Sequence, residues 1–86
     1  MDYNGYKNRA TWNVALWLGN DYGLYSAMCN YARNTAAERG RRHVTYRDFM
    51  RRCGLQGERT PDGFKYDGKT LDYRELTAVV RECLDD

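Results

Sequence analysis

The sequence predicts a mostly α-helical fold: a compact single domain of four helices, with a short β-hairpin or an ordered loop near residues 57–70. Three observations lead to this fold class. The chain has 86 residues, which is enough for one small core. Apolar residues recur at helical spacing, and residues that cap helices precede each such segment. The single proline, Pro61, lies in a stretch rich in glycine and aspartate that is typical of turns.

The first predicted helix, at about residues 9–18, lies in the most apolar stretch, NRATWNVALWLGNDYGLY, and we expect the other elements to pack around it. Between Trp12 and Leu18 only Asn13 is polar, so a helix here would be apolar nearly all round, as buried helices are. A strand over residues 11–18 is the alternative. The helix is favoured because Asn8 or Thr11 can cap its start and Gly19 can end it in the left-handed conformation.

Three further helices follow. The second starts at Asn20 or Asp21 and runs to about Arg39. The third and fourth each begin with a capping box, in which a cap side chain and an acidic side chain three residues later bond each other's backbone. These boxes are Thr45 with Asp48 and Asp72 with Glu75; Gly54 ends the third helix, and the fourth runs to the end of the chain.

Residues 1–8 form a polar arm at the start of the domain. It either covers Trp12 or Trp17 or reaches a partner, and the sequence leaves both open. Most tyrosines are expected at the core margin. The predicted core comprises Trp12, Leu16, Trp17, Leu24, Met28, Val44, Phe49, Leu55, Phe64, Leu71, Leu76, Val79 and Val80.

Charge is unevenly distributed, although the net charge is only +2. Six arginines lie within residues 39–52, while most acidic residues lie beyond residue 57. The arginines form either a solvated helix face, a phosphate-binding patch or a contact for an acidic protein, and the acidic end could imitate nucleic acid. The candidate partner-binding residues are Tyr3, Tyr6, Lys7, Arg9, Arg41, Arg42, Tyr46, Arg47, Arg51 and Arg52.

The third and fourth helices resemble each other. VTYRDFMRRC and LDYRELTAVVREC align on a Tyr-Arg-acidic-apolar pattern at an offset of 27 residues. Duplication and convergence on one helix-start signal both explain this alignment.

Catalytic and metal-binding patterns are lacking, so we expect a protein that is not an enzyme and has no metal or other cofactor. The sequence has no glycine-rich phosphate loop, and its single histidine, His43, is expected to contact solvent or cap a helix. The three cysteines, Cys29, Cys53 and Cys83, are widely spaced, which favours reduced thiols in an intracellular protein over disulfides or a zinc site. The longest apolar run has five residues, so no membrane-spanning segment is expected.

Two blocks of the sequence carry a resemblance. YKNRATWNVALWLGNDYGLY and GLQGERTPDGFKYDGKTLDYRELTAVVREC resemble a family of small proteins from bacteriophages, prophages and plasmids. An Asn-Arg-x-Thr-Trp-Asn-Val-x-Leu-Trp core and a Thr-Pro-Asp-Gly turn recur in that family. The resemblance implies an accessory protein of a mobile element, acting in the cytoplasm of a bacterial host, with no activity to carry over.

The leading functional hypothesis is a non-enzymatic, anti-CRISPR-like inhibitor. It would bind a host protein or ribonucleoprotein defence complex and block access to DNA or recruitment of a nuclease, as a monomer or a homodimer. The alternative is a small DNA- or RNA-binding protein that uses the arginines of residues 39–52.

Overall fold

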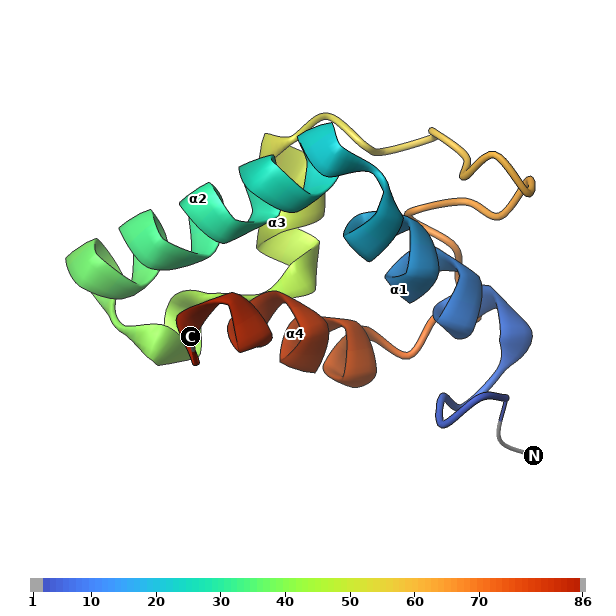
Figure 1. Cartoon of the computed structure of the whole chain (residues 1–86), viewed down its shortest axis with the longest axis horizontal. Helices are drawn as coiled ribbons and strands as arrows, with labels where there is room; N and C mark the ends of the chain where they lie inside the picture. Colours follow the sequence, from blue (N-terminus) through green and yellow to red (C-terminus); the bar gives the residue numbers. More distant parts are fainter. Residues whose placement is uncertain (1–2, 86) are drawn as a thin grey trace.

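The computed structural model describes residues 3–85 and confirms the mostly α-helical fold (Figure 1). Its α-helices are α1 (Arg9–Asn20), α2 (Tyr22–Arg39), α3 (Tyr46–Arg52) and α4 (Tyr73–Arg81). Two 3₁₀ turns, η1 (Arg41–His43) and η2 (Glu82–Leu84), follow α2 and α4. A tight turn joins α1 to α2, α3 and α4 pack together, and a long loop leads from α3 past α1 to α4 (Figure 1).

Each helix starts at a predicted cap. The side chains of Asn8, Asp21, Thr45 and Asp72 accept hydrogen bonds from backbone N–H groups in the first turns of α1, α2, α3 and α4. These bonds satisfy donors that have no partner inside a helix. The helical prediction for residues 11–18 is therefore confirmed over the strand alternative.

The predicted role of Gly19 is wrong. The first helix continues through Gly19 to Asn20, and the N–H of Asp21 donates to the carbonyl of Trp17 at 3.0 Å. Asp21 both ends α1 and caps α2, so no left-handed residue is needed there. Gly54 does end α3 as predicted, because it has φ of 71° and the N–H of Leu55 reaches back to the carbonyl of Met50.

Both predicted capping boxes form only in part, because their acidic side chains bind elsewhere. Asp48 accepts hydrogen bonds from the Tyr31 hydroxyl at 2.8 Å and from Arg52. Glu75 accepts from the backbone N–H of Lys7 at 2.8 Å. Asp48 thus links α3 to Tyr31 of α2 and also pairs with Arg52 of its own helix. Glu75 links α4 to the N-terminal arm.

The core lies between the four helices. Seven predicted core residues are buried: Met28, Val44, Phe49, Leu55, Leu71, Leu76 and Val80. Leu24 and Val79 are partly buried and pack against this core. The prediction was wrong for Trp12, Leu16, Trp17 and Phe64, which are only partly buried. Residues that it missed are Val14, Leu18, Cys29, Ala32, Tyr46, Met50, Tyr66 and Cys83.

Helix α1 buries polar side chains as well as apolar ones, and this explains why its tryptophans stay near the surface. Asn13, 1% exposed, donates to the Asp62 carboxylate and accepts from the Thr60 hydroxyl, both at 2.7 Å. The Trp17 indole donates to the same carboxylate at 2.8 Å. Thr11 accepts from the backbone N–H of Asp72 at 2.9 Å. The polar positions of the first block of the sequence therefore hold the loop and the start of α4.

Residues 57–70 form an ordered loop with one hairpin-like pairing. Arg59 and Lys65 make an isolated antiparallel bridge, and the N–H of Thr60 donates to the carbonyl of Phe64 at 2.8 Å. Tyr66 is the buried aromatic of this loop. Phe64, predicted for the core, lies half-buried with the Arg9 guanidinium 5.6 Å from its ring centre.

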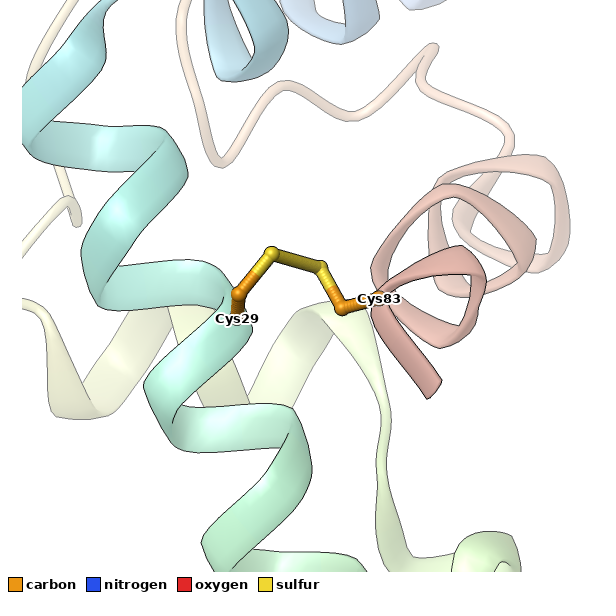
Figure 2. The surroundings of a disulfide bond; sticks show 2 residues. All are labelled: Cys29 and Cys83. Atoms are coloured by element: carbon orange, nitrogen blue, oxygen red, sulfur yellow. A yellow bond between two sulfur atoms is a disulfide. The ribbon is translucent and has the colours of Figure 1, made fainter. Parts of the chain in front are cut away.

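The expectation of reduced cysteines is wrong for two of the three. Cys29 in α2 and Cys83 in η2 form a disulfide that joins α2 to the C-terminal turn (Figure 2). Their Cα atoms are 5.1 Å apart, although the two residues are 54 positions apart in the chain. Cys53 is a free, exposed cysteine at the end of α3. Helix packing brings together sulfurs whose sequence spacing gave no such signal.

Candidate functional site

An open cleft between α3 and α4 gathers basic side chains. Its volume is about 550 Å³. The residues that line it are Thr45, Arg47, Tyr73, Arg74, Thr77 and Arg81. Three of these six are arginines and none is acidic, so the cleft has a positive potential.

Arg81 is held rigidly at one side of the cleft. Its Nε donates to the carbonyl of Val44 at 2.9 Å, and one terminal nitrogen donates to the carbonyl of Arg42 at 3.2 Å. The side chain is half-buried. Because these bonds fix the planar guanidinium before any ligand arrives, little side-chain entropy would be lost on binding.

Arg47 and Tyr73 line another part of the cleft. The Arg47 guanidinium lies 4.4 Å from the ring centre of Tyr73, and the Tyr73 hydroxyl donates to the carbonyl of Gly68 at 3.1 Å. Burial raises the pKa of Tyr73 and outweighs the lowering by Arg47 and Arg51, so the pKa lies above its ordinary value. Tyr73 is therefore neutral and presents a ring that orients Arg47.

The cleft can bind an oxyanion. Within residues 3–85, no carboxylate lies within ion-pair distance of Arg47, Arg74 or Arg81. The Thr77 hydroxyl accepts from the backbone N–H of Tyr46 at 3.0 Å, which leaves its own hydrogen to donate. Guanidinium groups and hydroxyls are the donors that recognise phosphate.

The predicted arginines separate into different environments. Arg47 lines the cleft, and Arg51 lies close enough to Tyr73 to affect its pKa. Arg52 pairs with Asp48 at 3.0 Å, and Arg41 pairs with Asp85 at 3.1 Å. The exposed Arg42 contributes its carbonyl to Arg81. Only part of the predicted arginine patch therefore faces one surface.

The prediction that Tyr46 contacts a partner is wrong. Tyr46 is fully buried, and its hydroxyl donates to the carbonyl of Tyr66 at 2.6 Å. Its ring packs against Tyr73 and Phe49. Tyr46 is a core residue, and its ring packs against Tyr73, which lines the cleft.

The N-terminal arm folds back on the domain, as the covering alternative expected. The ring of Tyr3 packs on Trp12 with centres 5.0 Å apart, and the backbones of Tyr3 and Tyr6 pair with each other. Tyr6 is half-buried, whereas Lys7 and Arg9 are exposed. The structure does not bring these four residues to the α3–α4 cleft.

Sequence reasoning missed Arg74, Thr77 and Arg81. A signal for Arg74 was present, since the alignment of the third and fourth predicted helices pairs Tyr46-Arg47 with Tyr73-Arg74. In the structure the two tyrosine rings pack 5.8 Å apart and both arginines line the cleft. Nothing in the sequence indicated Arg81, because its bonds go to residues 37 and 39 positions away.

No metal site and no membrane-spanning helix is found among residues 3–85. No three potential metal ligands lie together there, and none of the helices combines the length and apolar character needed to cross a bilayer. His43 is half-buried at η1, and its carbonyl oxygen lies 3.3 Å from the Tyr31 hydroxyl oxygen.

A protein-family model matches residues 1–86. The chain belongs to DUF7249, a family of unknown function. No curated protein and no solved structure matches this DUF7249 chain. Its function must therefore be argued from its own geometry, of which the α3–α4 cleft is the most distinctive part.

Proposed function

We propose that this DUF7249 chain is a non-enzymatic protein that binds the phosphate backbone of nucleic acid through the α3–α4 cleft. The observation that carries the proposal is the convergence of Arg47, Arg74 and Arg81 on one acid-free cleft. Several arginines along a surface suit a repeating anion, and nucleic acid is the polyanion with such a repeat.

The contacts would be to backbone and not to bases. Arg81 is fixed by two carbonyls and Arg47 by a ring, so both suit a phosphate at a set position. The tyrosine expected to stack on a base, Tyr46, is buried. Binding should therefore depend strongly on salt and weakly on sequence.

Fluorescence anisotropy of labelled duplex DNA and single-stranded RNA, measured across a salt series, tests this proposal. With three phosphates neutralised, the slope of log K against log salt on duplex should be about −2.7, a loss of about 40-fold in affinity between about 50 and 200 mM salt. The variant R47Q/R74Q should reduce the magnitude of this slope by about two units.

The matched control is R33Q, because Arg33 is an exposed arginine of α2 outside the cleft. R33Q should reduce the affinity for nucleic acid less than either single variant of the cleft, R47Q or R74Q. Absence of binding to any nucleic acid at low salt would overturn the proposal. An equal effect of R33Q and R74Q would also overturn it, since the cleft would then have no special part.

A second candidate is the anti-CRISPR-like inhibitor of a host defence complex. It is favoured by exposed tyrosines, a residue type common at protein hot spots: Tyr22 is 84% exposed and Tyr25 41% exposed, both in the first turn of α2. Its mobile-element origin is inferred from the resemblance of the two sequence blocks. The cytoplasmic location that both candidates imply rests on the sequence resemblance and not on the cysteines, two of which form a disulfide.

Plasmid-challenge assays across several CRISPR and restriction systems test this second candidate. Loss of immunity in one system, restored by Y22A but not by R33Q, would support it. Full immunity in every system would exclude it. R47Q/R74Q separates the two candidates, because inhibition through Tyr22 should survive loss of the arginine cleft.

A further inference from the structure

A second cleft lies between the N-terminal arm, α1, α2 and the C-terminal turn. Its volume is about 320 Å³, within the range of small-ligand sites. Ala15 and Gly19 of α1 line one part of it, and the small methyl group of Ala15 and the missing side chain of Gly19 leave room for a ligand. The rest of the lining, which includes one residue of α4, consists of Tyr6, Tyr25, Met28, Val79, Glu82 and Cys83.

The chemistry of this cleft suits an organic cation. Tyr6, Tyr25 and Met28 line it together with the carboxylate of Glu82, and no lysine or arginine of the described residues does so. Tyrosine rings attract cations over their faces, and a carboxylate supplies the opposite charge. Burial raises the pKa of Tyr6, and the negative charges of Glu82 and Glu75 raise it further, which indicates a negative potential at that end of the cleft.

Glu82 is available and well positioned. Within residues 3–85 no basic side chain lies within ion-pair distance of it. Met28 and Glu82 directly precede Cys29 and Cys83 in the sequence, and the disulfide between these cysteines joins α2 to the C-terminal turn at the cleft. The cross-link therefore holds together the two backbone segments from which Met28 and Glu82 line the same cleft.

We propose that this cleft binds the ammonium group of a lysine side chain on a partner protein. Charge complementarity supports a cation, and the single carboxylate suits a compact ammonium. The methyl and methylene groups of Ala15, Met28 and Val79 match the aliphatic stem of lysine. This site is separate from the arginine cleft, so its failure or success leaves the nucleic-acid proposal unaffected.

The probe is Nα-acetyl-lysine methylamide, titrated into the ¹⁵N-labelled protein with amide chemical shifts as the readout. Saturable shifts are expected at Tyr6, Gly19, Tyr25 and Glu82. The matched neutral ligand, with its ε-amine acetylated, should bind at least about tenfold more weakly, because it lacks the charge.

Two pairs of variants locate the site. E82Q should weaken binding of the lysine probe about fivefold, whereas E38Q, at an exposed glutamate of α2 outside the cleft, should not. Y25L should weaken it about threefold, and Y22L should leave it unchanged. Their amide spectra report directly whether each variant is folded.

Three results would overturn the proposal. They are absence of saturable shifts at the cleft residues, an equal response to the acetylated ligand, and a stronger response to the arginine analogue than to lysine.

Discussion

Replacing Asn13 by alanine should destabilise the protein strongly, although asparagine is a polar residue in an apolar helix. Its side chain is 1% exposed and bridges Thr60 and Asp62. Alanine would leave the buried Thr60 hydroxyl without its acceptor, at about 1–3 kcal/mol, and would open a small cavity, at about 1 kcal/mol. The higher helix propensity of alanine offsets roughly 0.5 kcal/mol of this cost.

The expected loss is about 2–3 kcal/mol in the free energy of unfolding, without any contribution from the water-facing bond to Asp62. For a domain of this size that corresponds to a fall in Tm of about 10–20 °C. Urea and thermal unfolding followed by circular dichroism measure both quantities. The control is N30A, at an exposed asparagine of α2, which should change stability by less than about 0.5 kcal/mol. A loss below about 1 kcal/mol for N13A would refute the assigned role of the network.

Three further predictions concern the cross-link, the acidic side chains and one glycine. C83S should lower the free energy of unfolding by about 2–4 kcal/mol, because the disulfide with Cys29 closes a loop of 54 residues, and a similar fall should follow reduction of the parent protein by dithiothreitol. Hydrogen bonds from Asn13 and then Trp17 lower the pKa of Asp62. The stabilising effect of its carboxylate is therefore present above the unfolded-state pKa and is lost as pH falls through the folded-state pKa. In D62N, the free energy of unfolding measured with urea should fall less as the pH is lowered into the acid range. G40A should lower the free energy of unfolding, measured by thermal unfolding, by about 1–3 kcal/mol, because Gly40 has φ of 100° and ψ of 155°. The control G19A, at a helical position, should not lower it.

Local signals in the sequence predicted helix starts well, since a cap and the N–H groups that it binds lie within three residues. Asn8, Asp21, Thr45 and Asp72 all act as expected. Hydrophobic patterning alone could not reveal which face of α1 is buried. The Thr11 hydroxyl donates to the nearby Asn8, but the N–H from which it accepts lies 61 residues away, and both partners of the Asn13 side chain lie 47–49 residues away. These distant partners make it favourable to bury the two polar side chains.

The sequence predicted only part of the candidate site, because most of its residues come together through contacts between distant segments. Arg47 was identified from the local cluster of arginines, but Arg74 and Arg81 reach the cleft only through the packing of α4 on α3. Tyr46 was placed on the surface because tyrosine suits both surfaces and cores, and its buried bond to the Tyr66 carbonyl depends on the path of the loop. The disulfide was missed because cysteine spacing carries no information on which helices meet.

The bonds between α1 and the loop also bear on how the chain emerges from the ribosome. Helix α1 is synthesised early, yet the Asn13 side chain receives its partners Thr60 and Asp62, and the Thr11 hydroxyl the N–H of Asp72, only after residues 60–72 have been added. A nascent chain that stops before residue 57 would leave the Asn13 amide of α1 without the partners that it has in the folded protein. The first two helices are therefore not a self-sufficient folding unit, and the last third of the polypeptide completes what the first begins.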